Sequence, residues 1–203
     1  TQIRLMELPE RPIIKLAKSC HVDHFFRNGT LQLGSFNYYA SYDHAEVGDK
    51  QEGIVTAIAK ADWGFVAGNY GSGFENYVFC ATSATENVTL SDSFGYDSGF
   101  IIDDPYGFAK AIQKSVGSSS SLYAMCEYSP IKAIIGSSAR EIDRFSISDE
   151  TAKMITSAKY FVKPLRYANQ NEFRFLWEAS RDLHGAELVH CPEAIQFCRK
   201  LRV

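Results

Sequence analysis

Short apolar runs, separated by polar and glycine-rich segments, predict a chain built mainly from short strands. The clearest strand is expected at residues 77–83, where four apolar residues follow one another and indicate burial on both faces. Aromatic residues at every second position of 173–177 predict another strand, which opens at Glu172 and buries one face. Further strands are expected at residues 13–17, 30–33, 54–60, 99–102, 122–128, 131–136, 160–162 and 187–190.

Helices are expected where capping residues frame the ends of a segment. Residues 22–28 end at Gly29, which is typical of a helix C-terminus, and Pro105 starts a helix to Lys114 with Asp103 or Asp104 placed to cap it. Other short helices are expected near 149–157 and at 192–200. Residues 64–73 contain four glycines, which predict a hairpin connection or a mobile loop. A phosphate loop is not expected there, because its sequence pattern is missing.

These elements together predict an α+β protein, because strands and helices are not in strict βαβ alternation. The expected architecture is a mostly antiparallel, split β-sandwich with small peripheral helices. With 203 residues, of which 45% are hydrophobic, the chain is predicted to form a single domain over residues 1–203.

The candidate chemistry lies in the triplet Gln170-Asn171-Glu172, where a polar loop enters a strand. Residues two apart in an extended segment point to the same face, so the amide and the carboxylate are expected to project into one site. A carboxylate stabilises an oxocarbenium-like transition state and bonds a ribose hydroxyl, while an amide both donates to and accepts from a nucleophile. Taken alone, the triplet fits a solvated hairpin tip equally well. Its place between two expected strands favours a functional site.

The order of three features resembles bacterial ADP-ribosyltransferases of the Q-x-E type: Lys15 on the first strand, Thr82-Ser83 at the end of a middle strand, and the late Gln170-x-Glu172. Nearly the whole chain also resembles a little-characterised bacterial and phage domain family. That likeness is carried by an "NGTLxLG" turn at 28–34, an aromatic pair, a D-x-x-E-G turn at 49–53, an "FCxTS" strand and a "K-P…E-F-R" ending. The resemblance implies an ADP-ribosyltransferase-like fold with NAD as substrate, although Lys15 stands where arginine or histidine is usual.

The resemblance also implies a role for each matched residue. Glu172 would stabilise the positive charge on the ribose carbon as nicotinamide leaves, and Gln170 would orient the acceptor. The remaining candidates are Lys15, Tyr38, Tyr39, Thr82 and Ser83 for binding NAD, and Tyr167 and Arg174 for recognising the acceptor.

Structural roles for several of these residues stay open. The two tyrosines equally fit core positions, Lys15 a lysine that extends along a strand, and Thr82-Ser83 ordinary strand-end hydroxyls. Asp49 and Glu52 either form a second carboxylate pair or belong to a turn bounded by glycines.

Composition changes the picture in three ways. The chain has no apolar run long enough to predict a membrane span, and its first residues lack the pattern of a secretory signal. A cytoplasmic location is therefore expected. Five cysteines without paired spacing predict buried free thiols, and a metal site is not expected because the usual ligand spacings are missing. Residues 61–109 carry seven acidic and no basic residues, so the rest of the chain is net positive, with Arg199, Lys200 and Arg202 at its end. This basic side suits NAD or RNA, or is a dipolar surface without function.

Two functional hypotheses follow. In the first, the chain is an ADP-ribosyltransferase toxin of a bacterial toxin–antitoxin or anti-phage defence system, which modifies RNA or a protein and has a possible antitoxin partner. The basic C-terminal end and Tyr167 favour RNA slightly, because aromatic rings stack on unpaired bases. In the second, the same fold is a non-catalytic module that binds a nucleotide or a nucleic acid. A nuclease is a weaker option, because the scattered histidines give no acid–base pair.

Overall fold

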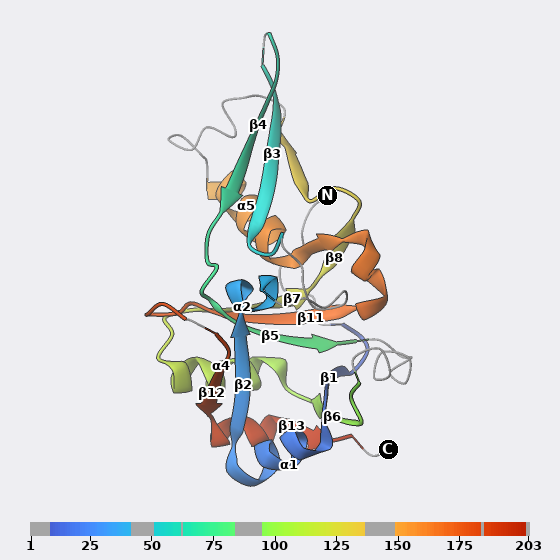
Figure 1. Cartoon of the computed structure of the whole chain (residues 1–203), viewed down its shortest axis with the longest axis vertical. Helices are drawn as coiled ribbons and strands as arrows, with labels where there is room; N and C mark the ends of the chain where they lie inside the picture. The colour runs from blue at the N-terminus through green and yellow to red at the C-terminus, as the bar shows by residue number, and fades with distance from the viewer. Residues whose placement is uncertain are drawn as a thin grey trace.

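The computed structural model describes residues 9–41, 51–61, 63–83, 95–136, 149–183 and 185–201. They form one large, mostly antiparallel sheet, two small sheets and several short helices (Figure 1). This arrangement confirms the predicted α+β class.

The large sheet has eight strands in the described part of the chain, and β5 lies at its centre. The strands are β1 (Ile13–Ala17), β2 (Thr30–Ser35), β5 (Tyr77–Thr82), β6 (Ser98–Ile102), β7 (Ser121–Met125), β11 (Glu172–Trp177), β12 (Glu187–His190) and β13 (Cys198–Lys200). Their order is β12-β2-β5-β1-β6-β13, and β11 pairs with both β5 and β7. The prediction of a central, doubly buried strand at 77–83 is therefore confirmed.

The sheet forks along one edge of β5. On its other edge, β5 pairs with β11 over all six residues. On the forked edge, Tyr77 and Val78 pair with β2, whereas Thr82 pairs with β1. Between these two contacts, residues 79–81 have no partner strand on that edge among the described elements. Side chains can therefore occupy the space between the two diverging strands β1 and β2.

Four α-helices and two 3-10 helices are described. They are α1 (Ser19–Asn28), α2 (Phe36–Ala40), α4 (Pro105–Val116), α5 (Asp149–Phe161), η2 (Leu165–Gln170) and η3 (Pro192–Phe197). Gly29 ends α1 in the left-handed conformation with φ 66°, and the Asp104 side chain accepts a hydrogen bond from the Gly107 N–H at the start of α4. Both caps match the sequence-based predictions.

The main core lies between the large sheet and helices α1, α4 and η3. Phe175 is fully buried and its ring contacts the rings of Phe108 and Phe79 at centroid distances of 5.2 and 6.2 Å. Trp177 donates from its indole nitrogen to the Ala109 carbonyl at 2.9 Å. Each such side chain contributes roughly 1.5–3 kcal/mol by leaving water, so this aromatic cluster is a main source of stability.

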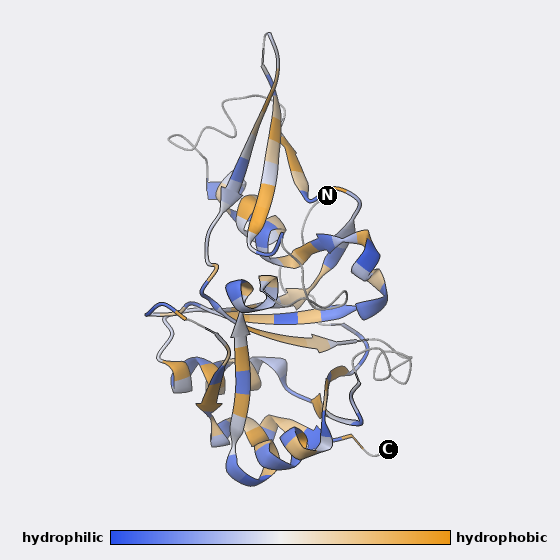
Figure 2. Ribbon diagram, viewed as in Figure 1, coloured by the Kyte–Doolittle hydropathy of each residue, from blue (hydrophilic) through white to orange (hydrophobic). Residues whose placement is uncertain are grey.

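Two small sheets lie on the other side of β5 and β11 (Figure 1). Strands β4 (Gly64–Gly71), β3 (Ile54–Ala61) and β9 (Ala133–Gly136) form one, and α5 covers one of its faces through contacts with all three strands. Strands β10 (Val162–Pro164) and β8 (Glu127–Ser129) form the other, which is parallel. Figure 2 shows β3 as largely hydrophobic, and hydrophilic positions interrupt the otherwise hydrophobic β11.

Four local predictions were wrong. Residues 64–71 form strand β4 rather than a connection or loop, because their side chains alternate and pair with β3 over eight positions. Tyr160 and Phe161 end helix α5 instead of forming a strand, because tertiary packing of the helix overrides the strand preference of aromatic residues. The predicted helix at 192–200 is a 3-10 helix followed by β13. Finally, β11 is buried on both faces rather than on one, because Phe36 of α2 and Tyr160 and Phe161 of α5 pack on the second face.

No helix among the described residues is long and apolar enough to cross a membrane.

Candidate functional site

A cavity of about 120 Å³ lies at the fork of the large sheet. Its polar lining comes from β1, α2, β5, β10, η2 and β11, together with the residues before β3: Lys15, Tyr39, Glu52, Thr82, Lys163, Gln170, Glu172 and Arg174. Its apolar lining includes Ile14, Leu16 and Ala81. A cavity of roughly 150 Å³ holds one benzene ring, so this space suits one ring-sized part of a ligand.

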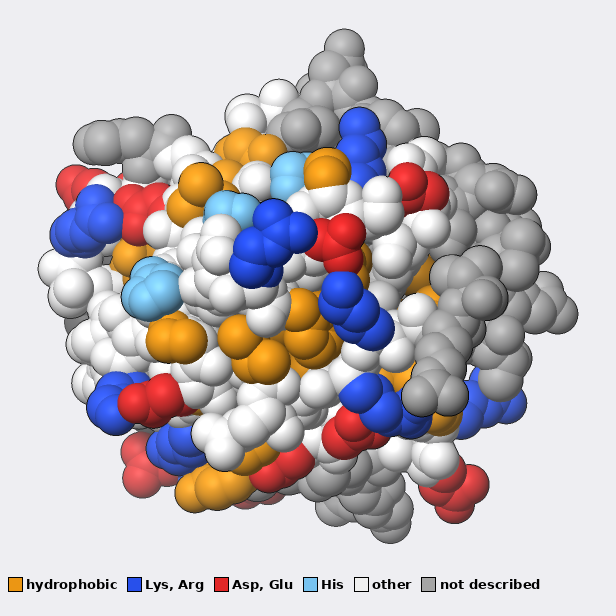
Figure 3. Space-filling view, turned by 90° about the horizontal axis from the view of Figure 1, so that it is seen from below, with side chains coloured by type: hydrophobic (Ala, Val, Ile, Leu, Met, Phe, Trp, Pro, Cys, Tyr) orange, Lys and Arg blue, Asp and Glu red, His pale blue; other side chains and the backbone are white. Residues whose placement is uncertain are grey.

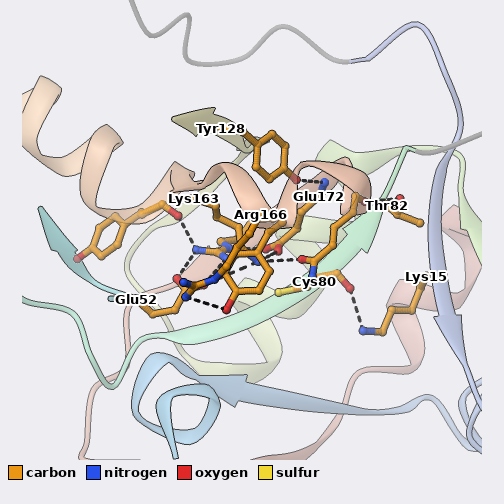
Figure 4. Close-up of polar contacts among 12 residues, drawn as sticks. Lys15, Glu52, Cys80, Thr82, Tyr128, Lys163, Arg166 and Glu172 are labelled. Carbon is orange, nitrogen blue, oxygen red and sulfur yellow. Dashed lines mark hydrogen bonds and ion pairs between the residues drawn. The ribbon is translucent and has the colours of Figure 1, made fainter. Parts of the chain in front are cut away.

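Glu172 is the first residue of β11 and is fixed by four hydrogen bonds (Figure 4). Its backbone N–H donates to the Tyr128 hydroxyl at 2.7 Å, and its carbonyl accepts from the Cys126 N–H at 2.8 Å. Its Oε1 accepts from Arg174 Nε and its Oε2 from Lys163 Nζ, both at 2.6 Å. The side chain is thus held in a single orientation at the wall of the cavity.

Glu172 is ionised although it is only 4% exposed. Burial alone would raise the pKa of the carboxyl, but the charges and hydrogen bonds of Arg174 and Lys163 together outweigh it and hold the pKa well below its usual range. The site therefore contains a carboxylate that keeps its negative charge without exposure to bulk water.

Gln170 and Glu172 lie close together, but the backbone between them is not extended as the sequence predicted. Gln170 ends η2, and Asn171 follows in the left-handed conformation with φ 39°. Lys163 Nζ donates to the Gln170 Oε1 at 2.9 Å as well as to Glu172. The amide and the carboxylate do lie together, because one ammonium bridges them rather than because of strand alternation.

Arg174 lies behind Glu172 and is 1% exposed. Its two terminal nitrogens donate to the two carboxylate oxygens of Glu52 at 2.7 and 2.8 Å, and Nη1 also donates to the Tyr160 carbonyl at 2.6 Å. This bidentate pair leaves the guanidinium engaged on every side. The sequence assigned Arg174 to recognition of the acceptor, whereas its contacts support Glu172 from within the protein.

The buried charges around Glu172 balance one another. Lys163 and Arg174 carry two positive charges, and Glu52 and Glu172 carry two negative ones, with a further Lys163–Glu52 separation of 4.0 Å. Burial would lower the pKa of Lys163, but Glu172 and Glu52 outweigh it, so the pKa is raised and the ammonium stays charged. We call Glu52, Lys163, Glu172 and Arg174 the charge cluster.

Lys15 approaches the cavity from β1. Its Nζ donates to the Cys80 carbonyl at 2.8 Å and lies 4.5 Å from the centroid of the Phe79 ring. It thereby satisfies a carbonyl of β5 at the fork. Burial lowers the pKa of Lys15, and the proximity of Cys80 and Glu172 only partly offsets that effect. The side chain places an amine at the cavity, outside the balanced charge cluster.

The other residues expected to bind NAD divide into two groups. Tyr39 and Thr82 line the cavity, and Thr82 donates from its hydroxyl to the Gln170 carbonyl at 2.7 Å. Tyr38 and Ser83 are not among the lining residues; Tyr38 packs against Tyr39, and the Ser83 hydroxyl lies 3.5 Å from the Met125 sulfur. Burial raises the pKa of the Tyr39 phenol well above its usual value, so the hydroxyl remains protonated.

The features expected to recognise RNA do not form an open surface. Tyr167 is 2% exposed, and its ring lies between the cations of Lys163 and Arg166, each 4.8 Å from its centroid. At the C-terminal end, Arg199 pairs with Asp103 and Lys200 pairs with Asp23 at 2.9 and 2.6 Å. Figure 3 shows basic and acidic side chains interspersed on this face. Arg202 lies outside the described residues.

Comparisons of the chain with models of protein families, with curated proteins and with solved structures find no match. Function is therefore inferred from the geometry of the cavity and the charge cluster.

Sequence reasoning missed two members of this cluster. It gave Lys163 no role, although a lysine within the otherwise apolar segment 160–164 is a signal that a buried partner exists. It considered Glu52 only with Asp49, which lies outside the described residues, whereas Glu52 pairs with Arg174. The separation of 122 positions between Glu52 and Arg174 gives no local pattern that reveals the pair.

The described part of the chain offers neither a metal-binding cluster nor a disulfide. No group of three or more side chains there is arranged to hold a metal ion. The five cysteines are free, as predicted, but only Cys126 and Cys191 are buried, whereas Cys80 and Cys198 are half-buried and Cys20 is exposed.

Proposed function

We propose that this protein is an NAD-dependent ADP-ribosyltransferase with an ADP-ribosyltransferase-like, split antiparallel β-sandwich fold. The observation that carries the proposal is the ionised, buried carboxylate of Glu172 beside the Gln170 amide at the wall of the cavity. An oriented negative charge in a site shielded from water is well suited to stabilising a developing cation.

In the proposed reaction, the bond between the nicotinamide nitrogen and the ribose carbon breaks, and nicotinamide leaves as a neutral molecule with the bonding electrons. The ribose carbon becomes oxocarbenium-like and bonds to a lone pair of the acceptor, whose proton passes to solvent. A carboxylate offers about four lone-pair positions. Arg174 and Lys163 use two of them, so Glu172 retains the capacity to accept a bond from a ribose hydroxyl.

NAD would place only one ring-sized portion in the cavity, because the cavity is small compared with pockets for whole ligands, which measure roughly 300–1,000 Å³. Lys15, Tyr39 and Thr82 line this space and are the strongest candidates to contact NAD. Tyr38 and Ser83 would act beside them rather than on the ring itself.

The biological role that fits this chemistry is a toxin of a bacterial defence or conflict system, with an antitoxin as a possible partner. The acceptor is RNA or a protein. The slight preference for RNA loses its support, because Tyr167 is buried and the described basic residues at the C-terminal end are in ion pairs.

The test is incubation of the purified protein with labelled NAD and a cell lysate, followed by RNase or protease. Glu172→Gln conserves the shape of the side chain and removes its charge, so we expect label transfer to fall by about a hundredfold or more. Glu150→Gln, the same substitution at an exposed position of α5, is the matched control. Transfer at the wild-type rate by folded Glu172→Gln would refute the proposal.

A non-catalytic module that binds a nucleotide or nucleic acid is the second candidate. It is favoured by one observation: both carboxylate oxygens of Glu172 already accept bonds from cations, which reduces the field available to a substrate. Calorimetric binding of NAD without release of nicotinamide would support this candidate and exclude the transferase.

A further inference from the structure

Lys163 lies where it contacts both residues of the Gln-x-Glu triplet. Its ammonium is 2.6 Å from Glu172 Oε2 and 2.9 Å from Gln170 Oε1. An ammonium has three donors and no acceptor capacity, so it fixes an oxygen of each partner toward itself. Figure 4 shows Lys163 and Glu172 directed toward one another from β10 and the start of β11.

The backbone by itself does not impose this arrangement. Gln170 ends a 3-10 helix, Glu172 opens a strand, and the left-handed Asn171 separates them. The β10–β8 ladder supplies the missing constraint, because it places Lys163 opposite Tyr128. Lys163 then bonds the carboxylate of Glu172 while Tyr128 accepts a bond from its backbone N–H. Two neighbouring strands thus fix the same residue at its side chain and at its main chain.

We propose that Lys163 is the positioning residue of this site, whose ammonium holds the Gln170 amide and the Glu172 carboxylate as one unit at the cavity and pairs with the charge of that carboxylate. Its catalytic meaning rests on the proposed function, whereas its effect on the ionisation of Glu172 does not. Lys163 acts through Glu172 and Gln170, so it orients reacting groups rather than taking part in bond changes.

Among the groups that face Glu172, Lys163 and Arg174 are the cations bonded to its carboxylate. Lys15 acts on Glu172 through its charge, and Glu52 is the second carboxylate of the charge cluster, bonded to Arg174. Burial is the largest cause of the raised pKa of Tyr39, Tyr128, Cys80 and Cys126, with Cys80 at about 12, so these hydroxyls and thiols stay neutral in acid. If the charge of Lys163 is removed, Arg174 is therefore the main group that opposes the effect of burial on the pKa of Glu172.

The first experiment measures the titration of Glu172 directly. The carboxyl ¹³C signals of labelled protein are followed against pH, and Glu172→Gln assigns the signal of Glu172 apart from that of Glu52. In Lys163→Met, we expect the pKa of Glu172 to rise by about 1 to 3, the range over which a close opposite charge acts. Lys159→Met removes another buried lysine, which contacts Ser72 and the Tyr160 ring, and should leave the Glu172 signal unchanged. An unchanged titration in folded Lys163→Met overturns the proposal.

A second variant keeps the proposal testable if Lys163→Met does not fold. Lys163→Met combined with Glu172→Gln removes one charge of each sign and restores the balance of the charge cluster. We expect this double variant to fold even if Lys163→Met does not, and to unfold at a higher temperature than Lys163→Met if both fold. A double variant that is no more stable than the single one contradicts the pairing and the proposal with it.

Kinetics separate this proposal from the proposed function. Lys163→Arg keeps the charge but changes the reach of the side chain, so we expect kcat for NAD cleavage to fall about tenfold with little change in KM, since orientation is lost rather than binding. Unchanged kcat in Lys163→Arg would overturn the positioning of the triplet. A wild-type protein that cleaves no NAD removes the transferase assignment, while the Glu172 titration still decides the role of Lys163.

Discussion

The two faces of strand β11 are both buried, yet they are built from opposite chemistry. Phe173, Phe175 and Trp177 face the aromatic core, whereas Glu172 and Arg174 face the charge cluster. The aromatic face gains free energy simply by leaving water. The charged face must first overcome desolvation, and replacing such clusters by apolar residues is often neutral or stabilising. The aromatic face therefore explains the fold, and the charged face calls for a functional explanation.

The largest loss of stability is expected from Phe175→Ala. It removes a fully buried ring that packs against Phe79 and Phe108, and such truncations cost about 3–5 kcal/mol. Urea unfolding measures this loss, which should be the same at pH 5 and pH 8 because no charge is involved. Phe65→Ala is the control: that ring is 73% exposed, and its loss should change stability by no more than about 0.5 kcal/mol.

Arg174→Met sharpens the comparison on the other face of the strand. It leaves Glu52 and Glu172 buried with Lys163, and an uncompensated buried charge costs about 3–5 kcal/mol. Unlike the loss from Phe175→Ala, this loss should shrink from pH 8 to pH 5, because the carboxylates can then take up protons. Adding Glu52→Gln restores the charge balance and should recover part of the stability. If urea unfolding shows no recovery, the balance of the charge cluster is not what stabilises it.

Gln170→Ala is expected to affect activity more than stability. If Gln170 orients the acceptor, transfer to the macromolecule should fall about tenfold, while hydrolysis of NAD should fall less. Parallel assays of label transfer and nicotinamide release measure the two outcomes. Equal losses would mean that Gln170 serves the common step of bond cleavage instead.

The smallest effect is the contribution of Glu172 to stability in acid. Its pKa is lowered in the folded protein, so its stabilising contribution is fully present above the unfolded value of about 4.3 and is lost as the pH falls toward the folded value. The free energy of unfolding should therefore fall less steeply below pH 4 in the balanced Lys163→Met, Glu172→Gln variant than in the wild type. Parallel slopes would show that Glu172 is not the group responsible.

Local sequence signals predicted much of the fold. The bounds of β1 were predicted as found, β5 was recognised as central from its continuous apolar residues, and the caps of α1 and α4 were read from Gly29 and Asp104. These features depend on residues adjacent in the chain. Strand β4 was missed because its glycines suggested a loop, and only its pairing with β3 makes it a strand.

The candidate site was only partly predictable for the same reason. Of the candidates named from the sequence, Gln170, Glu172, Lys15, Tyr39 and Thr82 line a common cavity, whereas Tyr38 and Ser83 are not among its lining residues. What holds them together was not visible, because the Glu52–Arg174 pair and the fork in the sheet are made by segments that are distant in sequence. Glu52 and Arg174 have no local pattern that distinguishes a buried ion pair from charged residues on a surface.

Gly34 in β2 acts as a spacer for the cavity wall. A β-carbon at this position would lie 2.8 Å from carbon atoms of the Tyr39 ring, which is closer than such atoms normally approach. Tyr39 lines the cavity, so the lack of a side chain at Gly34 sets how far the ring can retreat from it. A single added methyl group would have to displace that ring, which makes Gly34 a place where the width of the cavity can be tuned without touching any charged residue.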